Sequence, residues 1–508
     1  MTIVLPESYT AQMRSLLGCE AERFLNAYTA PRTQGLRFHT RKLSELGAEA
    51  REELLAALTE KLGLEPVPWC RSGYYYREDA RPGKQPYHAA GLYYIQEPSA
   101  MSAVELLAPE PGDTVLDLAA APGGKSTHIL DKLHGRGLLI SNEIHPVRAR
   151  SLSENVERMG GTNAVVVNAS PPQLESRFPR FFDKIMVDAP CSGEGMFRKD
   201  PDAIREWSPA HVEMCAARQL DILHSAVHML KVGGTLAYST CTFNEQENER
   251  TVEALLAAYP ALELVRTERI WPHLHRGEGH FVAVLRLRGE ADSEGLDAAE
   301  AGATHETIAV QQSLNATAGR HLLAAQEDRQ SPVAAGRGRA RKGAAAPKGR
   351  RGSKPEDDAM KLFAQFADTL GGESFTQRLF AMLGPGEPLL FGEQLYWLPA
   401  GEQGSLRSDS LHGLKVLRPG LHLAELKKDR AEPAHALALA MDAALAALAP
   451  AVELDPPQAE RYLRGETLEA ASSGSGWVLV TAGGFALGWG KQIGQQVKNH
   501  YPKGLRWH

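Results

Sequence analysis

Short apolar runs and longer helical patterns alternate along residues 113–287. The apolar runs fall at 113–119, 137–143, 164–168, 183–190, 233–241 and 280–287. Segments with apolar residues at helical spacing lie between them, at 123–133, 145–160, 211–230 and 244–259. This alternation predicts an α/β fold in which helices wrap a parallel sheet. Ligands of such sheets bind at the carboxyl ends of the strands.

A tract with few large apolar residues divides the chain. Residues 289–356 are rich in Ala, Gly, Ser and charge, and 337–354 hold eight Lys or Arg and no acid. Such a tract cannot bury enough apolar surface to offset its ordering entropy, so we expect a disordered basic linker. Attraction of phosphate is a second role open to it. The 508 residues then divide into an N-terminal domain (1–95), a core (96–288), the linker and a C-terminal region (357–508).

The composition indicates a reducing compartment. The five cysteines include no CxxC pair and no Cys/His spacing typical of zinc sites, so we expect neither a disulfide framework nor a metal site. No leader pattern opens the chain, and no apolar stretch is long enough to span a membrane. We therefore expect a cytoplasmic protein without membrane attachment. The net charge of -6 does not by itself indicate a nucleic-acid partner.

Polar residues at successive strand ends predict a nucleoside cofactor. The first end, DLAAAPGGKST at 117–127, has small residues that let a ligand approach the backbone. Its GKST resembles a P-loop, but that motif needs glycine where Ala119 stands, which leaves a P-loop protein as the alternative. Glu143 at the second end suits two ribose hydroxyls, Asn168 at the third would face adenine, and Asp188 is a further acid at the fourth.

Two cysteines follow neighbouring strands, Cys191 after the fourth and Cys241 after the fifth. Because these strand ends converge over one cleft, the pair suggests thiolate chemistry on a carbon atom. Asn244 and Glu247 form a capping-box pattern, which predicts that the next helix starts there. The helix N-terminus would favour the thiolate and the acids nearby oppose it, so the direction of any pKa shift stays open. Two buried apolar cysteines, as expected for Cys215, are the alternative.

Four motifs at these strand ends resemble those of the Sun-type RNA cytosine carbon-5 methyltransferases. They are DLAAAPGGKSTHI, SNEIHPVRARSLSENVERMG, VDAPCSGEGMFRKDP and YSTCTFNEQENE. PRTQGLRFHT and QEPSAM upstream are similar to the same family, and two segments after the linker resemble its RsmF branch: LKVLRPGLHLAELKKDRAEPAHALALA and GFALGWGKQIGQQVKNHYPKGLRW. The resemblance implies a Rossmann-like class I methyltransferase core, a small N-terminal α/β RNA-binding domain and a C-terminal α+β, PUA-like RNA-binding region.

The resemblance also implies a reaction: methyl transfer from S-adenosylmethionine to carbon 5 of cytosine in small-subunit (16S) ribosomal RNA. That carbon is a poor nucleophile, and addition of a thiolate to carbon 6 activates it. By resemblance Cys241 is the nucleophile, Cys191 assists its release, and Asp188 binds the cytosine edge. An exchange of the two cysteine roles, as in the DNA enzymes, is the alternative. The base must leave its stack to reach such a site.

The family's cofactor site maps onto residues at the same strand ends. They are Ala119, Ala120, Ala121, Pro122, Gly123, Gly124, Lys125, Glu143, Arg148, Asn168 and Asp188. The family usually has aspartate where Asn168 stands, so we expect weaker or reoriented recognition of adenine. Ala119 replaces a cysteine common in the family, and no chemistry should depend on it.

Basic residues beside aromatic ones suit RNA binding. Arg198 and Lys199 follow Phe197 shortly after Cys191. The C-terminal segment interleaves Lys491, Lys498, Lys503 and Arg506 with Trp489, His500, Tyr501 and Trp507. We expect ribosomal RNA and the small ribosomal subunit as partners, and a monomer. Solvated loops, a plain stabilising barrel, an assembly factor without activity and a DNA methyltransferase are the alternatives.

Overall fold

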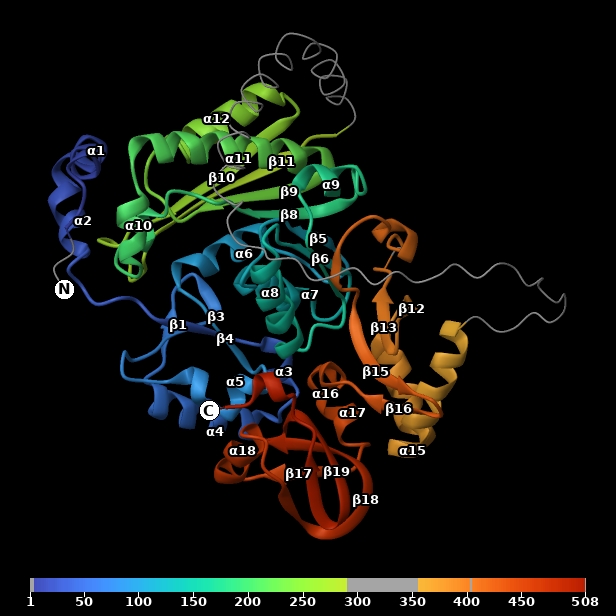
Figure 1. Ribbon diagram of the computed structural model, residues 1–508. Helices are drawn as coiled ribbons and strands as arrows, with labels where there is room; N and C mark the ends of the chain where they lie inside the picture. Colours follow the sequence, from blue (N-terminus) through green and yellow to red (C-terminus); the bar gives the residue numbers. More distant parts are fainter. Residues whose placement is uncertain (1–3, 290–354, 403, 508) are drawn as a thin grey trace, which may run out of the picture.

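The computed structural model describes residues 4–289, 355–402 and 404–507; Figure 1 shows their arrangement. The predicted linker lies almost entirely outside the described residues, and its basic segment 337–354 lies wholly outside them. The last residues of the predicted linker belong to a helix, which begins at Pro355.

An eight-stranded sheet forms the centre of the molecule, as the alternating pattern predicts. Its order is β10-β11-β9-β8-β5-β6-β7-β14. Five strands are parallel: β5 (Thr114–Asp117), β6 (Leu138–Asn142), β7 (Ala164–Val167), β8 (Phe182–Asp188) and β9 (Leu230–Thr240). Three antiparallel strands complete the edges: β10 (Leu262–Ile270), β11 (His280–Leu287) and β14 (Val416–Arg418). The carboxyl ends of the parallel strands therefore share one edge of the sheet.

Helices cover both faces of this sheet (Figure 1). One face packs against α6 (Ser102–Leu107), α7 (Gly124–Leu133) and α8 (Pro146–Arg158). The other packs against α9 (Pro171–Glu175), α11 (Pro209–Met229) and α12 (Glu249–Ala258). Strands buried on both faces need continuous apolar runs, and every residue of β7 is buried. The two apolar clusters hold the strand ends in fixed positions.

The helix after Cys241 starts later than the capping-box pattern predicts. Asn244 and Glu247 do bond reciprocally, with Glu247 N–H donating to Asn244 Oδ1 at 2.9 Å and Asn244 Nδ2 donating to Glu247 Oε1 at 2.8 Å. Helix α12, however, begins only at Glu249. The Glu247 carboxylate also accepts hydrogen bonds from Ser192 of the neighbouring loop. Glu247 thus joins two loops as well as capping the chain at Asn244. Cys241 therefore does not lie at a helix N-terminus.

The N-terminal region contributes a second sheet, of order β2-β3-β1-β4. Its strands are β1 (Gly35–Phe38), β2 (Glu65–Val67), β3 (Cys70–Tyr75) and β4 (Tyr93–Ile95), accompanied by α3 (Thr40–Ser44), α4 (Ala48–Leu62) and α5 (Pro86–Ala89). The preceding helices, α1 (Glu7–Leu17) and α2 (Ala21–Ala27), pack apart from this sheet. Their Tyr9 and Phe24 form an aromatic cluster with Phe197, Trp207 and Phe243, on the segments that follow the two cysteines.

The C-terminal region forms two smaller sheets. The first consists of β12 (Gly386–Phe391), β13 (Gln394–Pro399), β15 (Leu421–Lys427) and β16 (Arg430–Pro433), packed on α15 (Pro355–Leu383). The second consists of β17 (Ala451–Leu454), β18 (Leu468–Ala482) and β19 (Phe485–Asn499), with α16 (His435–Ala440), α17 (Ala443–Ala446) and α18 (Pro456–Leu463) nearby.

One apolar cluster joins the two ends of the chain. Leu36, Phe38 and Tyr93 of the N-terminal sheet belong to the same cluster as Tyr462 and Val480 of the C-terminal region. The two terminal regions therefore lie side by side beneath the core (Figure 1). Across the described residues, none of the helices is both long and apolar enough to cross a bilayer.

Candidate active site

The sulfur atoms of Cys191 and Cys241 lie 3.3 Å apart. Cys191 belongs to the loop after β8, and Cys241 directly follows β9. The predicted convergence of these strand ends is thus present in the structure. The hydrogen bond to Cys241, together with burial, raises the pKa of Cys191. Either sulfur can donate in this contact, and the raised pKa favours the protonated form of Cys191.

Two buried carboxylates clamp the loops that carry the cysteines. Glu194 accepts hydrogen bonds from the Phe243 N–H at 2.7 Å and the Asn244 N–H at 3.0 Å. Glu247 reaches the opposite way and accepts from the Ser192 N–H at 2.9 Å. Both carboxylates are fully buried. Sequence reasoning missed Glu194 and treated Glu247 as a helix cap and as one of the acids near Cys241, because pairing across loops leaves no local signal.

Asp188 is held at the edge of the same site. Its Oδ2 lies 2.9 Å from Nζ of Lys125, and its Oδ1 accepts a hydrogen bond from Ser239 Oγ at 2.9 Å. Burial alone would raise the pKa of Asp188, but the charge of Lys125, the neighbouring His280 and the hydrogen bonds from Lys125 and Ser239 together outweigh it, and the pKa is lowered. Asp188 is therefore a carboxylate that accepts, and does not donate, hydrogen bonds.

Two cavities meet at Asp188 and Cys241. The larger, of about 740 Å³, is also lined by Ala119, Ala121, Glu143 and Arg148 from the predicted cofactor set. The smaller, of about 390 Å³, is lined by Ala119, Ala120, Ala121, Pro122, Gly124, Lys125 and Arg148 from that set. Cys241 therefore lines both cavities, whereas Cys191 lines the larger one.

The larger cavity suits a nucleoside. Glu143 is almost fully buried, and its carboxylate accepts a hydrogen bond from the His145 N–H at 2.9 Å and pairs with the exposed Arg148 at 3.2 Å. Arg148 also donates from NH2 to the Ala121 carbonyl at 2.7 Å, which ties Glu143 to the turn after β5. Ile144, which is 53% exposed, and the Pro171–Pro172 pair add apolar lining that sequence reasoning missed. Flat apolar walls of this kind suit a purine ring.

Two residues of the predicted cofactor set line neither cavity, Gly123 and Asn168. Asn168 Nδ2 donates instead to the carbonyls of Glu143 and Ile144, at 2.7 and 2.8 Å. The amide nitrogen of Asn168 thus holds the loop that carries Glu143, and its contact with adenine stays a prediction. Gly123 has a φ of +113°, a conformation that favours glycine.

The predicted RNA contacts after Cys191 are mostly structural. Phe197 is fully buried in the aromatic cluster. Arg198 forms a buried ion pair with Glu278 at 2.7 Å and donates to the carbonyl of Ala27 at 3.1 Å. Only Lys199 is exposed, and it lines the smaller cavity. The prediction that Phe197 and Arg198 grip RNA is therefore wrong, because both hold helix α2 against the core.

Some of the C-terminal aromatic residues are likewise buried in the core and cannot contact RNA. Trp489 is 2% exposed, and its Nε1 donates to the Ala434 carbonyl at 2.9 Å. Tyr501 is also buried. The ammonium of Lys491 lies 5.6 Å from the ring centre of Trp477, which sequence reasoning did not select. Trp489 and Tyr501 are core residues, so the predicted RNA surface is smaller than the sequence pattern indicates.

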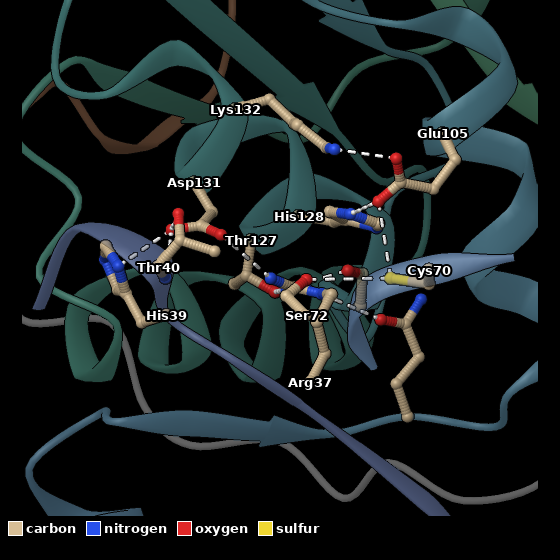
Figure 2. Close-up of polar contacts among 12 residues, drawn as sticks. Arg37, His39, Thr40, Cys70, Ser72, Glu105, Thr127, His128, Asp131 and Lys132 are labelled. Carbon is tan, nitrogen blue, oxygen red and sulfur yellow. Dashed lines mark hydrogen bonds and ion pairs between the residues drawn. The ribbon is translucent and has the colours of Figure 1, made fainter. Parts of the chain in front are cut away.

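A buried polar cluster joins the N-terminal sheet to the core (Figure 2). Arg37 of β1 donates from NH2 to Oγ1 of Thr127 on α7 at 3.1 Å, and Thr127 Oγ1 donates in turn to the Gly123 carbonyl at 2.8 Å. Asp131 of α7 pairs with Nδ1 of His39 at 2.9 Å. The turn that lines the smaller cavity is thus held from the N-terminal region.

Beside this cluster, the ligand-type atoms of Cys70, Glu105 and His128 lie within 4.8 Å of one another. His128 Nε2 is 3.1 Å and Lys132 Nζ 2.7 Å from the Glu105 carboxylate, which also accepts from Cys70 Sγ at 3.3 Å. These contacts account for the grouping without an ion, so the expected absence of a metal stays a prediction.

Comparisons with known proteins agree along the chain. The model described as 16S rRNA methyltransferase RsmB/F matches residues 104–286. The N-terminal domain of 16S rRNA methyltransferase RsmF matches 5–98, the first C-terminal domain of the RsmF rRNA methyltransferase matches 374–441, and the methyltransferase RsmF PUA domain matches 449–507.

Individual relatives extend this result. Ribosomal RNA small subunit methyltransferase F of Enterobacter sp. (strain 638) is 32% identical over 99% of this chain and 96% of its own length. The protein of the same name from Erwinia tasmaniensis is 36% identical in a stretch that spans 56% of this chain and 64%, just under two thirds, of that relative. The crystal structure of NSun6 from Pyrococcus horikoshii with SFG shares the fold, with a TM-score of 0.50 at 22% identity over 56% of this chain and 99% of that one.

Proposed function

Because the chain belongs to the family of 16S rRNA methyltransferase RsmF, we propose that it methylates carbon 5 of cytosine in small-subunit ribosomal RNA. The methyl donor is S-adenosylmethionine. A covalent bond between Cys241 and carbon 6 of the base activates the target carbon. The observation that carries this proposal is the 3.3 Å contact between Cys191 and Cys241 where the two cavities meet.

The larger cavity fits the methyl donor. The Glu143 carboxylate would take the ribose hydroxyls, and Ile144 with Pro171 and Pro172 would flank the adenine. When bound there, S-adenosylmethionine supplies an electrophilic methyl group. The smaller cavity, lined by Cys241 and Lys125, would take the flipped cytosine.

The two sulfurs divide the covalent chemistry. The Cys241 thiolate adds to carbon 6, and the electron pair of the C5–C6 double bond moves toward carbon 5 and the ring nitrogen, which makes carbon 5 nucleophilic. Carbon 5 then takes the methyl group, which leaves S-adenosylhomocysteine as the second product. After the methylated carbon 5 loses its proton to a base, the C5–C6 double bond re-forms and the bond from sulfur to carbon 6 breaks. Cys191 donates a hydrogen bond to the departing Cys241 sulfur and stabilises it as a thiolate.

The raised pKa of Cys191 supports this assignment over the exchanged one. A cysteine that keeps its proton is a poor nucleophile but a good hydrogen-bond donor. Asp188, ionised beside Lys125, accepts a hydrogen bond from the cytosine amino group. As a carboxylate it does not withdraw the electron density that the thiolate adds to the ring.

Mapping of 5-methylcytosine tests the proposal. The protein is incubated with S-adenosylmethionine and small ribosomal subunits, naked 16S RNA or duplex DNA, and the products are digested and analysed by mass spectrometry. We expect 5-methylcytosine in the RNA and none in the DNA. Methylation of another base, or of DNA alone, would reject the proposal, and transfer to neither substrate would favour an assembly factor without activity.

A further inference from the structure

His280 lines the smaller cavity, which Cys241 also lines. It opens β11, whose next residue, Phe281, pairs with Thr240 just before Cys241. The backbone ahead of it is pinned, because the Gly279 N–H donates to Ser99 Oγ at 3.2 Å. Gly279 has a φ of +114°, and a Cβ there would lie 2.2 Å from Phe243. The segment is thus built to hold the next side chain in one position.

The Nε2 atom of His280 is buried and has no hydrogen-bond partner among the described residues. The residue is 3% exposed and lines the smaller cavity together with Cys241 and Lys125. The nearest acid is Asp188, whose Oδ1 lies 3.9 Å from Nε2, beyond hydrogen-bond distance. A buried polar atom without a partner costs about 1–3 kcal/mol. A ligand of the cavity can remove this cost.

The surroundings of His280 favour a neutral imidazole with its hydrogen on Nε2. Burial, aided by the Lys125 ammonium, lowers the pKa of His280 to about 3. A neutral ring carries one N–H and one lone pair. Because Nε2 faces the Asp188 carboxylate, a lone pair there would be repelled and an N–H is favoured.

We propose that His280 Nε2–H donates a hydrogen bond to the acceptor side of the flipped cytosine, its ring nitrogen N3 and 2-oxo group. This inference rests on the proposed function and adds a residue to it. Asp188 accepts from the amino group, while His280 supplies the donor that the rest of the same edge requires. The pair therefore reads cytosine by one acceptor and one donor.

The same hydrogen bond strengthens during the reaction. When the Cys241 thiolate adds to carbon 6, negative charge builds on N3 and the 2-oxo group. A donor aimed at that position stabilises the transition state more than the ground state, and loss of one such donor costs about 10²–10³ in kcat. No proton needs to leave His280. Its effect should therefore fall on kcat more than on KM for RNA.

Three variants test this role. His280→Leu removes the donor and keeps much of the volume, whereas His280→Gln keeps an amide donor. His273→Leu serves as the matched control, since His273 is also buried but lines neither cavity. For each, kcat, KM for RNA, Kd for S-adenosylmethionine and the thermal unfolding midpoint are measured.

We expect His280→Leu to lose about 10² in kcat with nearly unchanged cofactor affinity and unfolding midpoint, and His280→Gln to recover at least part of the loss. His273→Leu should keep wild-type kcat. Wild-type kcat in His280→Leu, or equal losses in the Leu and Gln variants, would overturn the role of His280 while cytosine methylation by the wild type still stands. A wild-type protein that makes no 5-methylcytosine would overturn the proposed function instead.

Discussion

Replacement of Glu194 by glutamine should loosen the contact between the two cysteine loops. One carboxylate oxygen accepts from the backbone N–H groups of Phe243 and Asn244, at 2.7 and 3.0 Å. The other accepts from Nε1 of Trp207 and Nδ2 of Asn244, both at 3.0 Å. Whichever oxygen becomes an NH₂ group in Glu194→Gln, two buried donors then face another donor.

The size of this effect follows from those contacts. A buried donor without a partner costs about 1–3 kcal/mol, so two cost about 2–6 kcal/mol. Whole domains are stabilised by only about 5–15 kcal/mol, so much of this cost can be relieved by local opening of the loops. We therefore expect a lower unfolding midpoint and a fall in kcat of at least tenfold, since Cys191 and Cys241 no longer stay at 3.3 Å.

The assay combines thermal unfolding with methyl transfer to small ribosomal subunits. Glu213→Gln is the control, because Glu213 is an exposed residue of α11. If Glu194→Gln matched this control in both unfolding midpoint and kcat, Glu194 would not hold the two loops together.

Further predictions concern the cofactor, pH and the corrected RNA contacts. Glu143→Gln should raise the Kd for S-adenosylmethionine about tenfold by calorimetry, a loss of about 1.4 kcal/mol; an unchanged Kd would remove Glu143 from the cofactor site. Burial raises the pKa of Asp117 to about 7. The folded protein therefore keeps a proton that the unfolded chain has already lost, and the free energy of unfolding falls as pH rises toward 7. Asp117→Asn should therefore flatten the decline of the unfolding midpoint between about pH 5 and 7, and an identical slope would contradict the raised pKa. Arg198→Ala leaves Glu278 buried without its partner and should cost about 3–5 kcal/mol of stability. Lys199→Ala should instead keep the unfolding midpoint and weaken RNA binding, and the slope of log Kd against log salt concentration should fall by about one. Weaker RNA binding in Arg198→Ala without a loss of stability would restore Arg198 as an RNA contact.

The sequence predicted the parts of the fold that depend on local pattern. The apolar runs before Asp188 and Cys241 mark strands because their periodicity is set within a few residues. Once the sheet is parallel, its topology brings the ends of those strands together. The proximity of the two cysteines was therefore predictable, although their 3.3 Å distance was not.

The errors share one physical cause, which is burial decided by distant segments. Phe197 and Arg198 have the composition of an RNA-binding loop, but helix α2 covers them. Trp489 belongs to a basic–aromatic stretch of β19. Alternate residues of a strand face opposite sides of the sheet, and Trp489 is on the side that faces the core. Glu194 and His280 gain their roles only from partners on other loops, so no spacing within the sequence reveals them.

Denaturing gel electrophoresis of protein mixed with 16S RNA and S-adenosylmethionine tests the central claim most directly. In Cys191→Ala the Cys241 sulfur can add to the base but loses the hydrogen bond that assists its departure, so we predict a covalent protein–RNA band that persists in denaturant. Cys241→Ala should give neither this band nor any 5-methylcytosine. A covalent band in Cys241→Ala that is absent in Cys191→Ala would contradict the assignment of the two sulfurs.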